Sequence, residues 1–260
     1  MSERGEFGRA LLVACDISSF GSGDDILQLD KQRGLAAVLD EAAAAARLVR
    51  SSWHRNDRGD GELALLPDSE PEPRVIDDFI HQLTAALSRF NRHRVTQAQL
   101  RLRVAIHYGV AYPADNGYAG NGLVTVSRLL DSEPIRFALR DSTANLALII
   151  SDGVYQETVL NGHTSVGPDE FRKVSIRVKE YSADAWLWLP GKAAHGLRLT
   201  EDQADAAAGP APAGQPATGS ADRPRQPEPR PTVHQVFHGD IHATDPVFGF
   251  KIDNRHNSAD

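Results

Sequence analysis

One apolar stretch near the start of the chain constrains the fold more than any other feature. Residues 11–15 are all apolar and predict a buried strand, and Asp16 follows at its carboxyl end. A turn of small residues comes next, and Asp24 and Asp25 then mark the start of a long helix. The pattern predicts a carboxylate at the end of a central strand, with the backbone amides of residues 18–21 free to face a ligand.

A second carboxylate lies between two further predicted strands. Asp60 is flanked by glycines on both sides, so we expect it at the tip of a hairpin between residues 52–57 and residues 62–66. Carboxylates are ligands that suit Mg²⁺, an ion that also takes phosphate oxygens. Asp16 and Asp60 at neighbouring strand ends therefore predict a divalent-cation site.

Composition excludes several classes of protein. The 260 residues carry a formal net charge of −7, so the basic field typical of a nucleic-acid-binding protein is absent and we expect no nucleic acid partner. Cys15 is the only cysteine, which rules out a disulfide framework or a zinc site built on cysteines. The apolar runs are too short for a membrane span, and residues 1–9 are too polar for a signal peptide. We therefore expect a cytoplasmic protein with no membrane partner.

Hydrophobic periodicity divides the first 190 residues into strands and helices. Apolar residues at helical spacing predict helices at 35–49, 75–90, 123–130 and 135–139. Runs that are apolar or alternate predict strands at 11–15, 52–57, 62–66, 99–111, 146–150, 171–180 and 185–189. The hairpin after the first helix breaks the alternation of a parallel sheet. The order predicts an α/β (α+β) sandwich with a mainly antiparallel sheet and helices on one face.

The composition changes beyond the last predicted strand. Residues 203–231 hold seven of the fifteen prolines and no aromatic residue, which predicts a disordered linker. We therefore divide the chain into a domain at 1–190, a linker at 191–231 and a tail at 232–260. Residues 232–254 are apolar again, and two interpretations stay open. They form either a strand of the domain's own sheet or its dimer mate, or a docking motif that binds a protein partner as an added strand.

Five short motifs, taken in order, resemble the catalytic domain of class III nucleotidyl cyclases. The resemblance covers roughly residues 10–190 and is carried by residues 11–20, 59–61, 102–109, 127–129 and 178–180. Among the branches of the family, the chain looks most like the stand-alone bacterial cyclases. Some of these belong to antiphage systems that make cyclic pyrimidine nucleotides.

The resemblance implies a fold, an assembly and a set of site residues. The fold would be a ferredoxin-like core, and the assembly a head-to-tail homodimer with its sites at the interface. Asp16, the carbonyl of Ile17 and Asp60 match the family's metal ligands, which hold two Mg²⁺ or Mn²⁺ ions. Arg128 matches the catalytic arginine that one subunit offers to the other's metal site, and Lys179 matches a lysine that faces the triphosphate.

The implied substrate is a nucleoside triphosphate. The amides of Ser19, Phe20 and Gly21 would face its phosphates, and Asn56 stands where purine cyclases carry a base-reading lysine. The chain also departs from the family at Val124, which stands where the motif has an asparagine that orients the ribose.

Two functions from different classes follow. The first is a metal-dependent nucleotidyl cyclase, a lyase that makes a 3′,5′-cyclic nucleotide second messenger, with a role in antiphage signalling. The second, favoured by Val124, is a catalytically impaired cyclase-like module that binds nucleotide or dimerises and signals through its tail.

Overall fold

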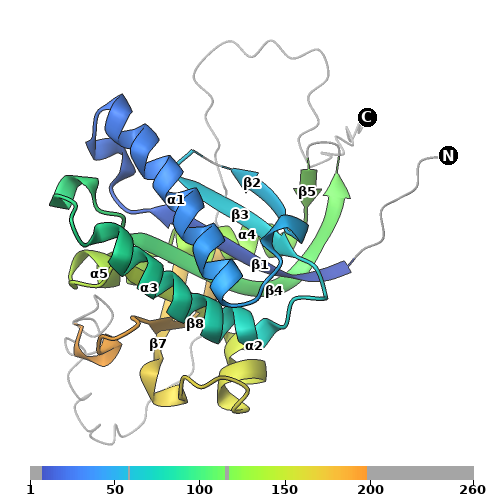
Figure 1. The fold of residues 1–260 in the computed structure, drawn as a ribbon. Helices are drawn as coiled ribbons and strands as arrows, with labels where there is room; N and C mark the ends of the chain where they lie inside the picture. Colours follow the sequence, from blue (N-terminus) through green and yellow to red (C-terminus); the bar gives the residue numbers. More distant parts are fainter. Residues whose placement is uncertain (1–7, 58, 115–116, 198–260) are drawn as a thin grey trace, which may run out of the picture. The chain divides into compact units, whose positions relative to one another are not determined.

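The computed structural model describes residues 8–57, 59–114 and 117–197. The main elements, in chain order, are β1 (Gly8–Ile17), α1 (Asp25–Ala45), β2 (His54–Asp57), β3 (Gly61–Leu66), α2 (Glu72–Arg74), α3 (Ile80–Asn91), β4 (Leu102–Ala114), β5 (Gly117–Ala119), α4 (Asn121–Leu130), α5 (Glu133–Arg140), β6 (Leu146–Ser151), α6 (Asp152–Val154), β7 (Arg172–Val178) and β8 (Tyr181–Trp188). Figure 1 shows them as a mixed α/β fold around one sheet.

The strands form a mainly antiparallel sheet in the order β2-β3-β1-β4-β6-β8-β7, and β5 pairs with β4. Among these pairs only β4 and β6 run parallel in the described part of the chain. The first four strands, β1 to β4, with α1 and α3 between them, have the connectivity and order of a ferredoxin-like core. The predicted fold class is therefore confirmed, and β1 is central, between β3 and β4.

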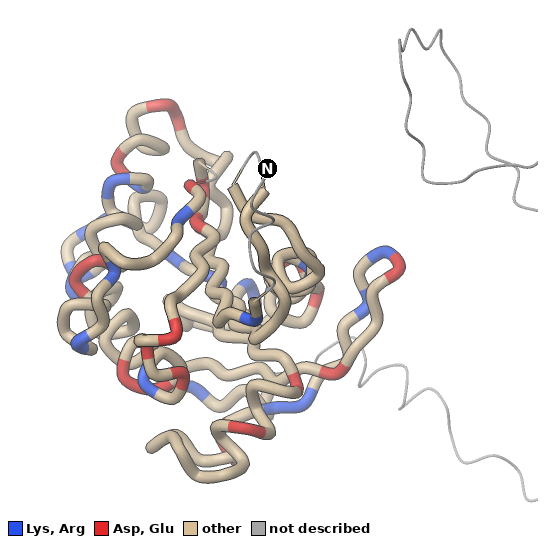
Figure 2. Tube along the Cα trace, turned by 90° about the vertical axis from the view of Figure 1, so that its right-hand side faces the viewer, with Lys and Arg blue, Asp and Glu red and all other residues tan. Residues whose placement is uncertain are grey.

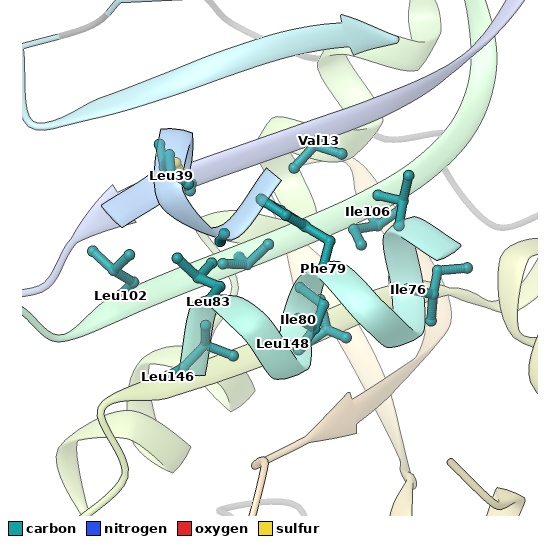
Figure 3. Packing of buried hydrophobic residues seen from close by; sticks show 14 of the residues in the cluster. Val13, Leu39, Ile76, Phe79, Ile80, Leu83, Leu102, Ile106, Leu146 and Leu148 are labelled. Atoms are coloured by element: carbon teal, nitrogen blue, oxygen red, sulfur yellow. The ribbon is translucent and has the colours of Figure 1, made fainter. Parts of the chain in front are cut away.

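One face of the sheet packs against α1 and α3. Alternate residues of β1, among them Val13 and Cys15, share a buried cluster with Leu39 of α1 and Leu83 of α3. Figure 3 shows the side chains of this cluster between the two helices and strands β1, β4 and β6. The apolar stripe predicted for residues 75–90 is therefore the face that packs against the sheet.

The opposite face of the sheet is also covered by helices. Leu12 and Ala14, which alternate with the residues of the first cluster, pack in a second buried cluster with Val126 of α4 and Ile135 of α5. Figure 1 places α4 and α5 on the side of the sheet away from α1 and α3. The prediction of helices on one face was therefore wrong. A continuously apolar strand such as residues 11–15 is buried on both faces, and that pattern already indicated two helical layers.

Several element boundaries follow local chemistry. Asp24 is the N-cap of α1, and its side chain accepts a hydrogen bond from the Leu27 amide at 2.8 Å, as predicted. Two elements were missed. Strand β5 has only three residues, and the helical segment Asp152–Leu160 combines α6 with a π-helix at Tyr155–Leu160. Short or irregular elements carry too few residues to show a period.

The described chain continues past residue 190. Ala194 is buried, and Arg172 donates hydrogen bonds to the carbonyls of Ala194 and Leu197, so residues 194–197 pack on the domain. The rest of the predicted linker, from residue 198, and the predicted tail lie outside the described residues. Acidic and basic residues are interspersed along the described trace in Figure 2. Within that trace, no helix is both long and apolar enough to cross a bilayer.

Candidate active site at the end of the central strand

Asp16 occupies the penultimate position of β1, as the sequence predicted. It pairs across the sheet with Gly61 of β3 on one side and with Arg103 of β4 on the other. Its neighbours Cys15 and Ile17 belong to the cluster on the α1 side, so the Asp16 side chain points to the α4 side. The strand therefore presents a carboxylate on the face that α4 covers.

Asp60 lies beside Asp16 because the β2–β3 hairpin closes against the end of β1. The Ile17 amide donates a hydrogen bond to the Asp60 carbonyl at 2.8 Å. Gly61 makes this approach feasible, since a Cβ there would lie 2.2 Å from the Cys15 carbonyl oxygen. The two predicted carboxylates are thus brought to one place by backbone contacts.

We expect Gly61→Ala to lower the free energy of unfolding by about 1–3 kcal/mol, because the hairpin must move away from β1 to admit the methyl group. Urea denaturation measures the change. Gly153→Ala is the matched control, since a Cβ at Gly153 meets nothing within 4 Å. Equal stability of the Gly61→Ala variant and the parent would contradict the close approach on which the position of Asp60 depends.

A pocket collects these groups. It lies between the end of β1, the start of β3 and the C-terminal end of α4, and its lining includes three aspartates and two α4 side chains: Asp16, Asp60, Asp131, Ser127 and Leu130. Asp131 is the C-cap of α4, where the helix dipole disfavours a negative charge. Three aspartates and the negative end of a helix therefore meet at this pocket, which Glu62 also lines.

Arg103 is the cation that balances Asp16. Its Nε donates to Asp16 Oδ1 at 2.7 Å and its Nη2 donates to Oδ2 at 2.6 Å, and both side chains are 13% exposed. Burial raises the pKa of Asp16 above its ordinary value, Arg103 opposes that shift, and the charges of Asp60 and Asp131 add to it. Asp16 is thus a half-buried carboxylate whose two oxygens a bidentate guanidinium occupies.

Arg103 and Asp131 are the site residues that sequence reasoning missed. Arg103 belongs to the 102–109 motif. An arginine that alternates with buried residues in a central strand needs a counter-charge. That signal predicts a partner but not its identity, since Asp16 is 87 residues away. Asp131 follows Arg128 by three residues, and only the packing of α4 shows that it reaches the pocket.

The donor set at the pocket fits a hard divalent cation. Carboxylate oxygens from Asp16 and Asp60 are the ligands that Mg²⁺ and Mn²⁺ prefer. In the residues that the structure describes, no group of three or more His, Cys, Asp and Glu side chains is arranged to hold a metal ion. Two aspartates would therefore have to share an ion with backbone and ligand oxygens, and Asp16 would have to release Arg103.

The turn after β1 differs in part from the prediction. The Ser18 amide is not free, because it donates to the Arg101 carbonyl at 2.8 Å. Ser19 has a positive φ of 58°, and the 3₁₀ turn Phe20–Ser22 follows it. The ring of Phe20 packs against the core, so only the backbone of this residue is a candidate for ligand contact. A phosphate-facing role is left to the amides of Ser19, Phe20 and Gly21.

Arg128 is directed away from the pocket that its neighbours line. Its Nη2 lies 3.5 Å from Glu180 Oε1, and its Nε is buried without a hydrogen-bond partner. The glutamate is 80% exposed and the arginine 19% exposed, so water screens this ion pair. The Nη2 donor can therefore exchange this screened partner for another acceptor, whereas the Nε is enclosed.

Lys179 lies at the tip of the β7–β8 hairpin. The register pairs Val178 with Tyr181, which leaves Lys179 and Glu180 as the two turn residues. Lys179 is exposed and has a positive φ of 55°. The strand predicted over residues 171–180 would include Lys179, but β7 ends at Val178 and the lysine lies in the turn. The hairpin tip and Arg128 are joined through Glu180.

Asn56 and Val124 lie on the same side of the sheet as Asp16. Asn56 is exposed on the edge strand β2 and pairs with Leu63, which belongs to the α4-side cluster, so both side chains point to that side. Nearby on this side, the rings of His54 and Tyr118 have centroids 5.2 Å apart. Val124 is 49% exposed on α4. The two positions that the resemblance assigns to the base and the ribose thus lie on an open surface.

Two sets of groups result on one chain. The acidic set, Asp16 and Asp60, can hold a cation. The basic set, Arg128 and Lys179, can bind an anion but does not line the same pocket. The arrangement suits a reaction in which one chain supplies the metal ligands and another supplies the cations.

Comparisons with known proteins agree with this architecture. No family model and no curated protein matches the chain. Among solved structures, an adenylate/guanylate cyclase/hydrolase from Silicibacter pomeroyi is similar with a TM-score of 0.52 and 19% identity, over 72% of this chain and 99% of that one. A bacterial light-regulated adenylyl cyclase is similar with a TM-score of 0.51 and 11% identity, over 71% of this chain and 53% of that one. The chain therefore has the fold of adenylate and guanylate cyclase domains.

Proposed function

We propose that this chain, folded as adenylate and guanylate cyclase domains are, is a metal-dependent nucleotidyl cyclase. The reaction is the conversion of a nucleoside triphosphate to a 3′,5′-cyclic nucleotide and pyrophosphate. The observation that carries the proposal is the convergence of Asp16 and Asp60 on one pocket of a cyclase fold. The site needs no covalent nucleophile, because the attacking oxygen belongs to the substrate.

The reaction closes one bond and opens another. The ribose 3′-oxygen attacks the α-phosphorus in line, the 3′-hydroxyl proton is lost, and the bond from the α-phosphorus to the bridging oxygen breaks as pyrophosphate leaves. Asp16 and Asp60, with the carbonyl of Ile17, would hold two Mg²⁺ or Mn²⁺ ions. When bound, such ions lower the pKa of the attacking hydroxyl and neutralise the leaving group.

The remaining residues bind and orient the substrate. Arg128 donates to the phosphoryl oxygens as negative charge develops on them, a role that suits a guanidinium whose ion pair with Glu180 is screened by water. Lys179 and the amides of Ser19, Phe20 and Gly21 hold the phosphates. Asn56 contacts the base.

The proposed assembly is a homodimer with composite sites. Arg128 does not line its own chain's aspartate pocket and contacts Glu180 instead. A second copy of the chain, related by a two-fold axis, would place its Arg128 and Lys179 at that pocket, and the relation would be reciprocal. Each dimer then has two equivalent sites.

A second function is favoured by one observation. Val124 offers an exposed methyl surface where a ribose-orienting asparagine would donate and accept hydrogen bonds. The alternative is a cyclase-like module that binds nucleotide or dimerises without turnover and signals through residues 232–254. Orientation is worth orders of magnitude in rate, so the loss of one contact could leave binding without catalysis.

The finer identity of the cyclase is also a proposal. Asn56 replaces a lysine that reads purines in related enzymes, which favours a pyrimidine triphosphate. We propose that the chain makes a cyclic pyrimidine nucleotide in antiphage defence, and that residues 232–254 contact a protein partner.

We expect the full chain, incubated with Mn²⁺ and each of the four common ribonucleoside triphosphates, to release a cyclic nucleotide and pyrophosphate in equal amounts from at least one of them. Mass spectrometry of the products measures this ratio. A substrate that yields only a diphosphate and orthophosphate indicates hydrolysis and contradicts the proposal. Tight nucleotide binding without any product supports the second function.

A further inference from the structure

The Asp16–Arg103 pair occupies the position that a divalent cation needs. Both carboxylate oxygens of Asp16 accept a hydrogen bond from Arg103, at 2.7 and 2.6 Å, and both side chains are 13% exposed. The pairing is fixed by the register of β1 and β4, in which the two residues are direct partners. A cation that approaches Asp16 therefore meets a guanidinium that already holds both oxygens.

Displacement of Arg103 by a bare ion is unfavourable on two counts. The guanidinium would lose its counter-charge in a site that water reaches poorly, and it would lie next to a like-charged ion. The wider pocket does not compensate. Asp131 is already paired with Arg136 at 2.7 Å, and Glu62 is paired with Arg50 at 2.7 Å.

The local balance of charge indicates what would release Arg103. Of the three aspartates at the pocket, Asp16 is paired with Arg103 and Asp131 with Arg136. These groups carry one net negative charge, so a divalent ion would leave one net positive charge. An anion that enters with the ion restores the balance. A phosphate group suits this role, because guanidinium binds two phosphate oxygens with the same fork that it uses for a carboxylate.

We propose that Arg103 is the resident counter-ion of Asp16 and makes binding of a divalent cation at Asp16 conditional on a phosphate ligand. The inference rests on the metal site of the proposed function but needs no cyclisation. The free protein keeps its aspartate neutralised and the ion enters with the phosphates. Arg103 is a positioning residue here: it opposes binding of the bare ion, and it no longer opposes binding of the ion that arrives with phosphate.

Equilibrium dialysis of Mn²⁺ against the full chain, with and without inorganic tripolyphosphate, tests the proposal without turnover. In the parent we expect tripolyphosphate to raise protein-bound Mn²⁺ at least about 10-fold at a fixed free-ion concentration. Arg103→Met should bind bare Mn²⁺ about 10-fold or more tightly than the parent, and tripolyphosphate should add less than about 2-fold. Arg103→Lys keeps the charge without the fork and should fall between them.

Two controls locate the effect. Arg140→Met removes an exposed guanidinium of α5 that pairs with Asp141 outside the pocket, and it should change binding of bare Mn²⁺ by less than about 2-fold. Asp16→Asn combined with Arg103→Met should lose the tighter binding of bare Mn²⁺ that Arg103→Met alone gives. Circular dichroism verifies folding, and if Arg103→Met does not fold, Arg103→Lys carries the test with the same sign.

The outcomes separate this inference from the proposed function. Equal binding of bare Mn²⁺ by the parent and the Arg103 variants, or an equal gain in Arg140→Met, overturns the inference alone. Failure of the parent to bind Mn²⁺ even with tripolyphosphate overturns both. Absence of cyclic product overturns neither the dialysis result nor its interpretation.

Discussion

Replacement of Asp60 by asparagine is expected to lower the affinity for a Mn²⁺–nucleoside triphosphate complex by more than about 100-fold. Loss of a residue that only hydrogen-bonds to a metal ligand already lowers metal affinity about 10–100-fold, and Asp60 is itself a proposed ligand. The asparagine side chain has the same shape as the aspartate that it replaces. The Asp60 carbonyl that accepts from the Ile17 amide is untouched, so the hairpin stays in place. Isothermal titration with a non-hydrolysable triphosphate and Mn²⁺ measures the affinity.

Asp60 is a sharper test than Asp16. Asp16→Asn also removes the counter-charge of Arg103 and destabilises the strand end, which mixes folding with ligand binding. Asp57→Asn is the matched control. Asp57 is in the same hairpin but pairs with Glu62, on the α1 side of the sheet, and should bind like the parent. Parental affinity in Asp60→Asn would remove Asp60 from the metal site.

The second large effect concerns Arg128. Arg128→Ala is expected to lower kcat by about 10²–10³-fold with little change in KM, because its donors act on charge that develops only as the bond to pyrophosphate breaks. The physical basis is a guanidinium whose Nε is buried and unpartnered and whose Nη2 is held only by an exposed glutamate. Steady-state kinetics with the preferred triphosphate measure the two constants.

The kinetic controls distinguish a role in the chemical step from a change in surface charge. Arg128→Lys keeps the charge without the planar fork and should recover only part of kcat. Arg136→Ala removes a half-exposed arginine of the next helix, and its kcat should stay within about 2-fold of the parent value. A rise in KM with unchanged kcat in Arg128→Ala would assign the residue to ground-state binding instead.

Prediction from sequence succeeded where a local pattern decides the structure. The apolar run before Asp16 is too continuous for an exposed strand, and the glycines around Asp60 permit the tight approach that Gly61 makes to Cys15. The cap at Asp24 depends on one hydrogen bond within the first helical turn. Such features need only neighbouring residues, so the sequence contains the information.

The parts that sequence missed depend on contacts between distant segments. The Asp16–Arg103 pair needs the register of two strands 87 residues apart, and the approach of Asp131 needs the packing of α4 on the sheet. The second helical layer, by contrast, was indicated by the continuous apolar run 11–15, and α4 and α5 cover the face to which Leu12 points. Positions in a turn, such as that of Lys179, shift by one residue with the end of a strand.

The central claim is that each active site combines Asp16 and Asp60 of one chain with Arg128 of the other. Purified heterodimers with differently tagged chains test it most directly, through the initial rate of cyclic nucleotide formation. A dimer of one Asp60→Asn chain and one Arg128→Ala chain keeps one intact composite site and should show about half the parent rate. A dimer of the parent chain and a chain that carries both substitutions keeps none and should be nearly inactive. The opposite pattern, an inactive first dimer and a half-active second one, would show that each chain completes its own site and would contradict the account.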